Sequence, residues 1–340
     1  MAVVVTTDLL VAASRLDAQR VQAAVPPACR RPPVTLEHPV VDAARGEATL
    51  SVPAWAPRAP AVHLLPSFAA LSDADWSARF EMSVHDGAQW SPWVGAASVG
   101  PATFDPIPPA PEALAADVDV FVARRPVASV RLRLRLGASD VRALLAAPWL
   151  LTLSAAGAGE RGYAAAARSG ATATARLAVP ALSQMSEDPA IALRVCSPAS
   201  VAMVMSFWGR SVGVATLAAE IYHAGLDRYG VWPAAIRAAA RRGVAGYLLR
   251  FPDWAAAAWC LERGLPVIAS IRYEAGELSH AAIPTTTGHL IVLTGYDNGT
   301  VLVNDPAAPN PTTVARRYHL DELTRAWLHH SGVGYVLFPP

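Results

Sequence analysis

A cysteine, a histidine and an aspartate stand where the sequence predicts the ends of regular elements. Cys196 directly precedes an apolar helical run, His289 opens the predicted strand HLIVLTGY, and Asp305 closes the next one, TVLVND. A thiolate can attack a carbonyl carbon, an imidazole can carry the proton, and a carboxylate can orient the imidazole. These residue types therefore indicate nucleophilic acyl transfer if the fold brings them together.

The setting of Cys196 favours a reactive thiol. Pro198 falls in the first turn of the predicted helix, where its missing N–H costs nothing. The helix dipole and the free N–H groups at a helix start favour the thiolate and lower its pKa. An ordinary buried cysteine remains the alternative for this segment alone. Cys29 and Cys260 lack such a setting, and Cys260, inside an alanine-rich helical run, is expected in the core.

His289 and Asp305 are expected to be neighbours. If their two strands are antiparallel and joined through residues 296–299, the start of the first lies beside the end of the second. A base and its orienting carboxylate need this geometry. The other histidines are expected to be surface or core residues: His38, His63, His85, His223, His280, His319, His329 and His330.

Acyl transfer also needs hydrogen-bond donors for the oxyanion that forms on the attacked carbonyl. The backbone N–H of Cys196, at the helix start, is one candidate. The side-chain amide of Gln184, upstream in the segment SQMSEDP, is the second. A loop glutamine by itself indicates nothing, so this interpretation depends on the order Gln, Cys, His, Asp.

The region around these residues has the pattern of an α+β domain, residues 179–340. An apolar helical run from Pro198 to Trp208 ends at Gly209, and further helices are expected at 214–224, 233–242, 253–263 and 320–329. Apolar strands lie after or between them: PVIASIRY, HLIVLTGY, TVLVND and GYVLF. Helices followed by sheet are typical of the α+β class.

Residues 1–156 have the pattern of an all-β, antiparallel, sandwich-like domain. Short runs with partial or strict alternation are bounded by Gly, Pro and Asp, and Asp86-Gly87 suits a tight hairpin turn. In RLRLRL, Arg131, Arg133 and Arg135 must face away from Leu132, Leu134 and Leu136. Residues 157–178, rich in Ala, Gly, Ser and Thr, are interpreted as a linker.

Three aromatic or basic features could bind ligands. Trp232, in the loop YGVWP before a helix, could line a substrate cleft, with core packing as the alternative. Residues 90–93, WSPW, could form a carbohydrate platform, with packing on the sandwich core favoured instead. The arginine face of RLRLRL could hold an anionic polymer, but a solvated face is favoured. A polymer ligand of the β domain is therefore left open.

Composition excludes several classes of protein. The net charge of +1 gives no bulk electrostatic attraction to nucleic acid or to a membrane. No uninterrupted apolar run reaches the length of a membrane-spanning helix. The N-terminus lacks the basic start of a secretory signal, so a cytoplasmic location is expected, or secretion if the N-terminus is trimmed. The candidate ligands are not clustered, so no metal or other cofactor is expected.

Several segments, taken in order, resemble the papain-like cysteine peptidases of the bacteriocin-leader (double-glycine) group, and especially their stand-alone bacterial relatives. These segments are SQM, CSPASVAMVMSFWG, YGVWP, PVIASIRY, GHLIVLTGYD and VLVNDPAA, within residues 180–340. The resemblance implies Cys196 as nucleophile, His289 as general base and acid, Asp305 as its orienting residue and Gln184 as oxyanion donor. Two features depart from the group: Ser197 follows the cysteine where many members have glycine, and Gln184 lies farther from Cys196.

The resulting hypothesis is a two-domain cysteine peptidase that cleaves a peptide or amide bond through a thioester intermediate. An acyltransferase or cross-linking enzyme would use the same residues and pass the acyl group to an amine. A non-catalytic binding protein with a vestigial site is the other alternative. A peptide or protein substrate is the expected partner, and the sequence identifies neither its cleavage site nor the oligomeric state.

Overall fold

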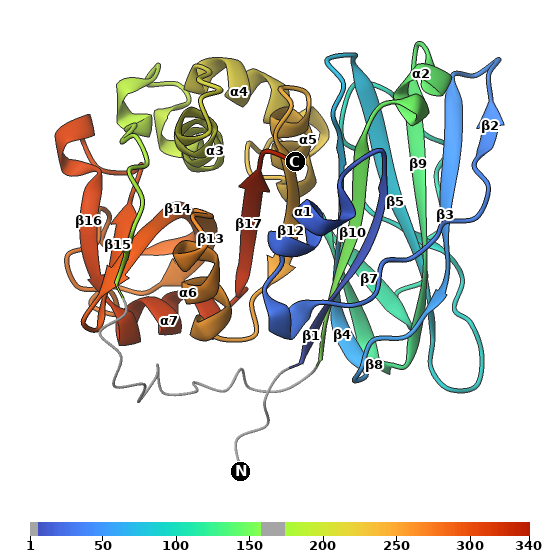
Figure 1. The fold of residues 1–340 in the computed structure, drawn as a ribbon, viewed down its shortest axis with the longest axis horizontal. Helices are drawn as coiled ribbons and strands as arrows, with labels where there is room; N and C mark the ends of the chain where they lie inside the picture. The colour runs from blue at the N-terminus through green and yellow to red at the C-terminus, as the bar shows by residue number, and fades with distance from the viewer. Residues whose placement is uncertain (1–5, 158–173) are drawn as a thin grey trace.

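The computed structural model describes residues 6–157 and 174–340, which form two units packed side by side (Figure 1). The N-terminal unit consists mainly of strands, and the C-terminal unit has helices on both faces of a sheet. Most of the predicted linker, residues 157–178, lies outside the described residues. Its end includes β11 (Ala175–Arg176), which pairs with a strand of the C-terminal sheet. No helix among the described residues is long and apolar enough to cross a membrane.

The N-terminal unit contains two five-stranded sheets whose neighbouring strands all pair antiparallel. One sheet has the order β1 (Thr7–Ser14), β10 (Trp149–Gly157), β4 (Ala61–Ala70), β8 (Val120–Val127) and β7 (Leu114–Asp117). The other has the order β2 (Val40–Asp42), β3 (Glu47–Trp55), β9 (Ser129–Ala138), β5 (Trp76–His85) and β6 (Val94–Gly95). Aromatic side chains meet between them, with the rings of Phe68 and Trp76 5.4 Å apart.

The alternation predicted for RLRLRL is present in β9. Leu132, Leu134 and Leu136 are fully buried, while the arginines lie on the opposite face. The rings of Trp90 and Trp93 were expected to pack on the sandwich core. They pack instead against the arginine face of β9. The guanidinium of Arg131 lies 3.9 Å from the ring centre of Trp90, and that of Arg133 lies 3.8 Å from the ring centre of Trp93. The outer face of the sheet is therefore partly covered by stacked rings.

The N-terminal unit also has features that were not predicted. It contains two short helices, α1 (Ala18–Ala23) and α2 (Val141–Ala146), each capped by an aspartate side chain that accepts backbone N–H groups. The strands β1 and β4 were not predicted either. Both are largely buried, so they lack the polar-apolar alternation that identifies a half-exposed strand.

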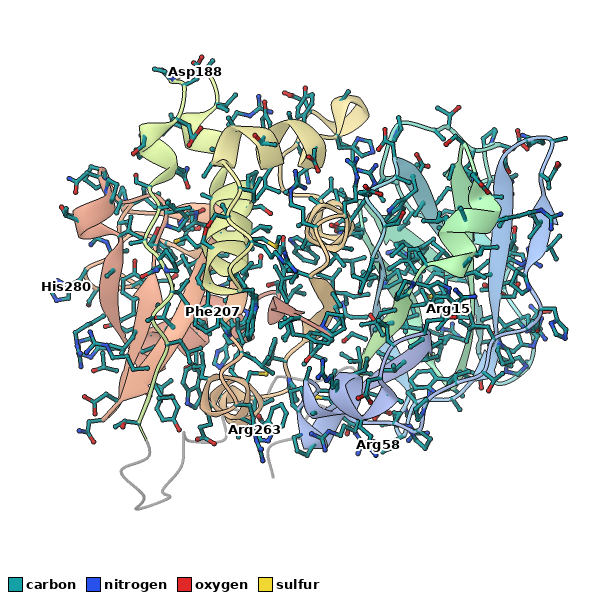
Figure 2. The ribbon with its side chains drawn as sticks, turned by 45° about the horizontal axis from the view of Figure 1, so that its top comes forward. Arg15, Arg58, Asp188, Phe207, Arg263 and His280 are labelled. Atoms are coloured by element: carbon teal, nitrogen blue, oxygen red, sulfur yellow. The ribbon has the colours of Figure 1, made fainter. Side chains whose placement is uncertain are left out.

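The C-terminal unit is an α+β structure. Its helices are α3 (Cys196–Phe207), α4 (Val214–Ile221), α5 (Trp232–Ala240), α6 (Trp254–Glu262) and α7 (Leu320–Leu328). Its sheet has the order β12 (Ala245–Arg250), β17 (Val333–Phe338), β13 (Val267–Tyr273), β14 (Thr286–Asp297), β15 (Thr300–Asn304) and β16 (Ala315–His319), with β11 beside β14. Figure 2 shows the side chains that fill this unit, with Asp188 and His280 at its outer edge. The predicted helices and strands are present, whereas β12 and β16 were not predicted.

The two units share a polar and apolar interface along β12. The N–H groups of Leu248 and Arg250 donate to the hydroxyls of Ser67 and Ser154 on β4 and β10. The Tyr247 hydroxyl donates to the carbonyl of Ala24, 2.6 Å away. An edge strand with unpaired N–H groups is a site for unwanted association, so these contacts protect the edge of the C-terminal sheet.

Candidate active site at the start of helix α3

Cys196, expected directly before the helix, is the first residue of α3. Its side chain is partly exposed, whereas nearly all of the helix behind it is buried. The helix is apolar on all sides because it crosses the interior of the unit, and Gly209, with φ of +70°, follows its end. The thiol thus sits at the positive end of a rigidly packed helix.

His289 and Asp305 are adjacent in the sheet beside Cys196. The strands β14 and β15 pair antiparallel, with Val292 opposite Asn304, so His289 lies near the residues that follow β15. The Nε2 atom of His289 is 2.7 Å from Oδ1 of Asp305. His289 is 3% exposed and Asp305 fully buried. Strand β14 begins at Thr286, so His289 lies inside the strand rather than at its start.

The imidazole of His289 contacts both other groups. It forms a side-chain hydrogen bond with Cys196, while its Nε2 is occupied by Asp305. The backbone N–H groups of Leu290 and Ser197 also face the sulfur of Cys196. Since Nε2 meets the carboxylate, Nδ1 is the ring nitrogen left for the thiol. Sulfur, imidazole and carboxylate therefore form one continuous line of contacts.

Asp305 has two further hydrogen-bond donors that sequence reasoning missed. The Tyr318 hydroxyl donates to Oδ2 at 2.6 Å, and the N–H of Ala307 donates to Oδ1 at 3.0 Å. Tyr318 comes from β16, which pairs with β15 and so turns the side chain toward the carboxylate. No spacing in the sequence signals this contact, because it depends on the pairing of a strand that was not predicted. A buried carboxylate with this many donors is held in one orientation.

The electrostatics of the three groups reinforce one another. Burial lowers the pKa of His289, but the nearby Asp305 carboxylate and hydrogen bonds to Asp305 and Cys196 outweigh burial and raise this pKa to about 10. Burial raises the pKa of Cys196, yet the hydrogen bond and charge of His289 lower it below its ordinary value overall. Burial likewise raises the pKa of Asp305, and the charge and hydrogen bond of His289 lower it overall. The favoured state is a thiolate beside an imidazolium.

Gln184 lies in a 3₁₀ turn, Gln184–Ser186, held against the loop after Asp305. Its N–H donates to the carbonyl of Pro306 at 2.9 Å, and its side-chain Nε2 donates to the carbonyl of Ala192 at 2.7 Å. Its Oε1 is buried without a hydrogen-bond partner among the described residues. The side-chain amide of the predicted oxyanion donor is thus directed at the 3₁₀ turn Ala192–Arg194, which precedes Cys196.

A cleft of about 680 Å³ opens at Cys196, within the usual range for ligand sites. Trp232, the predicted substrate contact, lines it at the start of α5. The N-terminal unit also lines it, through His63, Leu65, Val122 and residues 117–120. Sequence analysis assigned none of these residues to the site, because no local pattern indicates which surface of one unit faces the other.

The other two cysteines differ from Cys196. Cys29 and Cys260 are fully buried, and burial raises the pKa of the Cys29 thiol to about 12 and that of Cys260 well above its ordinary value. All three cysteines are free thiols. Within residues 6–157 and 174–340, no group of three or more His, Cys, Asp or Glu side chains could hold a metal ion.

Comparison with known proteins gives one family. Residues 176–335 match the Peptidase_C39 like family. A comparison with curated proteins gives no match. Among solved structures, the chain is similar to a double glycine motif protease from an AMS/PCAT transporter in complex with the leader peptide. The two sequences are 19% identical, the TM-score is 0.34, and the match covers 49% of this chain and 95% of the other. It is also similar to the peptidase domain of Streptococcus ComA, a bi-functional ABC transporter involved in quorum sensing, with 18% identity, a TM-score of 0.33 and coverage of 44% and 93%.

Proposed function

We propose that residues 176–335, which match the Peptidase_C39 like family, form a cysteine peptidase whose nucleophile is Cys196. The observation that supports the proposal most directly is the line of contacts from sulfur through imidazole to carboxylate. His289 bonds to Cys196 on one side and to Asp305, at 2.7 Å, on the other. The line ends at a cleft large enough for a peptide segment.

The proposed reaction begins with the Cys196 thiolate, which attacks the carbonyl carbon of a peptide bond. The imidazolium of His289 then gives its proton to the leaving amine, and a thioester forms on the sulfur. In the second half, His289 takes a proton from water, the hydroxide attacks the thioester, and the acid product leaves. Asp305 keeps the imidazole in the orientation and tautomer that both halves need.

The oxyanion that forms on the attacked carbonyl needs two donors. Cys196 is the first residue of α3, and the first N–H groups of a helix have no acceptor within it. Gln184 is the second proposed donor. A side-chain amide has two N–H bonds, and only one of those of Gln184 is directed at Ala192, which leaves the other for the substrate.

The test uses the full chain and a library of proteome-derived peptides, with new termini detected by mass spectrometry. Wild type should cleave peptides, and Cys196→Ala and His289→Ala should not. His38→Ala is the matched control because His38 is exposed and lies in the N-terminal unit. No cleavage by wild type would overturn the proposal. Products that carry an added amine in place of water would instead assign the acyltransferase reaction.

A further inference from the structure

The cleft at Cys196 lies between the two units. On one side are residues of the C-terminal unit such as Trp232 and Ser270, and on the other are residues of β4, β7 and β8 of the N-terminal unit. The N-terminal unit approaches with the two-residue turn between β7 and β8, in which Asp117 pairs with Val120. This turn and Cys196 therefore line the same cleft.

The β7–β8 turn has a strained backbone. Val118 has φ of +59°, a region that β-branched residues rarely adopt, and the Asp119 N–H closes the turn on the Asp117 carbonyl at 2.7 Å. The Val118 carbonyl accepts from the N–H of Ala97 at 3.0 Å, which holds the turn in place. Such strain often occurs where a ligand binds.

The β7–β8 turn also contacts the start of α5, the helix that begins at Trp232. The Asp119 carboxylate, 7% exposed, accepts from the Trp232 N–H at 2.6 Å, and Val231, the residue before α5, provides no side-chain cap. The first N–H groups of a helix have no acceptor within it, so Asp119, which accepts from one of them, acts as a cap supplied by the other unit. Trp232 thus owes its position in the cleft partly to the N-terminal unit.

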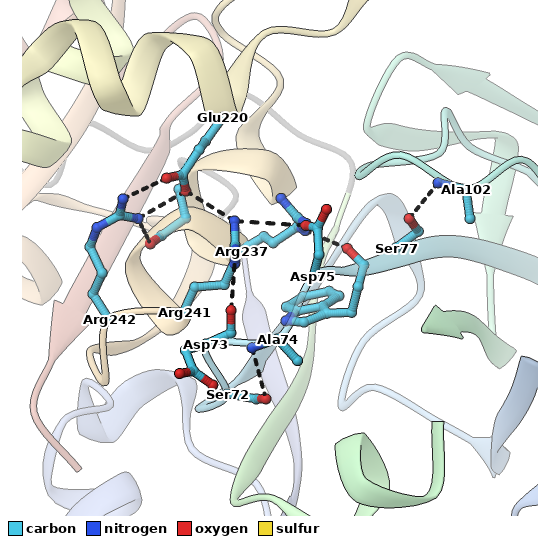
Figure 3. A network of polar contacts seen from close by, with 12 residues as sticks. Ser72, Asp73, Ala74, Asp75, Ser77, Ala102, Glu220, Arg237, Arg241 and Arg242 are labelled. Carbon is cyan, nitrogen blue, oxygen red and sulfur yellow. Dashed lines mark hydrogen bonds and ion pairs between the residues drawn. The ribbon is translucent and has the colours of Figure 1, made fainter. Parts of the chain in front are cut away.

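The N-terminal unit holds α5 at a second point. Figure 3 shows the buried Arg237 side chain directed at Asp75 and at the backbone of the N-terminal unit. Its Nε donates to the carbonyl of Trp76 at 2.6 Å, and its guanidinium lies 5.2 Å from the Trp76 ring centre. Arg241 donates to the carbonyl of Asp73 at 3.1 Å. These contacts join the two units beside the cleft, in addition to the contact between Asp119 and Trp232.

The N-terminal unit presents an apolar surface to the cleft. Val118, Val120 and Val122 are half-buried and line the cleft, with the fully buried Leu65 behind them. The partly buried indole of Trp232 lines the same cleft from the C-terminal unit. Apolar side chains that remain partly exposed in a cleft gain free energy when an apolar ligand group covers them.

We infer that the N-terminal unit selects the substrate: the wall formed by Val118, Val120 and Val122 binds an apolar side chain of the peptide close to the scissile bond, and Asp119 positions Trp232 against it. This inference rests on the proposed function, since it assigns the substrate side chain for that same site. It makes the valines specificity-determining residues and Asp119 a positioning residue.

The test measures alkylation of Cys196 in the full chain, which requires no turnover. The probes are tetrapeptidyl chloromethyl ketones that carry leucine or aspartate at each position in turn, and iodoacetamide serves as the reference because it is too small to need the wall. In wild type, leucine at one position should accelerate alkylation. Val120→Ser and Val122→Ser should each lower the leucine-to-aspartate rate ratio at that position about tenfold, with the iodoacetamide rate unchanged.

Two controls separate specificity from folding and from chemistry. Val40→Ser removes a valine that is 70% exposed on β2, outside the cleft, and should behave as wild type. Asp119→Ala should lower the same ratio, and Asp119→Asn, which keeps an acceptor for the Trp232 N–H, should restore most of it. Unchanged leucine-to-aspartate rate ratios in both valine variants would overturn this inference. They would not affect the proposal that the chain is a peptidase. Absence of peptide cleavage by wild type would overturn the proposed function, and unreactive Cys196 would overturn both.

Discussion

The Nε2 atom of His289 lies 2.7 Å from Oδ1 of Asp305, and both side chains are almost entirely shielded from solvent. The contact depends on the antiparallel pairing of β14 with β15, which brings the two residues together across the sheet. It explains why the pKa of His289 is raised to about 10 despite burial, which opposes the charged form. The consequences for activity and stability can be measured.

Asp305→Asn should reduce peptide cleavage by about 10³–10⁴-fold if the site acts as proposed. The amide removes the negative charge and can stabilise the wrong tautomer of His289. Turnover should fall much more than the Michaelis constant changes, and steady-state kinetics would detect this. A variant with more than a tenth of wild-type turnover would show that Asp305 does not orient the base.

Tyr318→Phe should lower the free energy of unfolding by about 1–3 kcal/mol, because a donor to a buried carboxylate is lost. The pKa of Asp305 should rise, so the acidic limb of the activity profile should move to higher pH. Urea unfolding and a pH–rate profile would measure both effects. Tyr335→Phe is the matched control, since its hydroxyl is also buried and its hydrogen-bond partner within residues 6–157 and 174–340, the Ser197 hydroxyl, is neutral and lies at 3.4 Å. Equal effects of the two substitutions would contradict the special role of Tyr318.

Alkylation of Cys196 by iodoacetamide should titrate at a pH below the ordinary thiol value of 9.0, because the imidazolium of His289 stabilises the thiolate. His289→Ala should move the inflection upward and slow alkylation at neutral pH. Rate constants measured from pH 4 to pH 10 would show the shift. The buried Cys29 and Cys260 should stay unmodified in the folded protein. Identical profiles for wild type and variant would mean that His289 does not activate the thiol.

Gln184→Ala should lower turnover by about 10²–10³-fold if its free N–H binds the oxyanion. The Michaelis constant should change little, because the interaction develops only in the transition state. Circular dichroism would show whether the contact with Ala192 is needed for folding. A loss of stability without a loss of turnover in the folded fraction would assign Gln184 a structural role.

Asp119 should make stability depend on pH. Burial raises its pKa to about 7 from 3.8, with Asp117 adding to the rise and the Trp232 N–H and Arg228 opposing it. The folded state then holds a proton that the unfolded state loses above about pH 4, so stability should fall as pH rises from 4 to 7. The loss is about 4 kcal/mol, because one pKa unit corresponds to about 1.4 kcal/mol. Asp119→Asn should lack this loss in unfolding experiments, and parallel curves for the two proteins would refute it.

Local sequence patterns predicted much of the C-terminal unit. The apolar run before Gly209 indicated α3, and the runs that became β13, β14 and β15 were continuous enough to recognise. Because antiparallel neighbours joined by a short connection have few possible registers, the adjacency of His289 and Asp305 followed from the sequence.

Other features depended on contacts between distant segments. Tyr318 reaches Asp305 only because β16 pairs with β15, and the short polar stretch that forms β16 has no clear strand pattern. Asp119 reaches the Trp232 N–H only because two separately patterned units pack together. Local propensity and alternation depend on near neighbours in the chain, and so the sequence determined the elements and the order of the reactive residues. Which buried groups satisfy one another, and which surface closes the cleft, was decided by tertiary packing, because those contacts join residues with no fixed spacing.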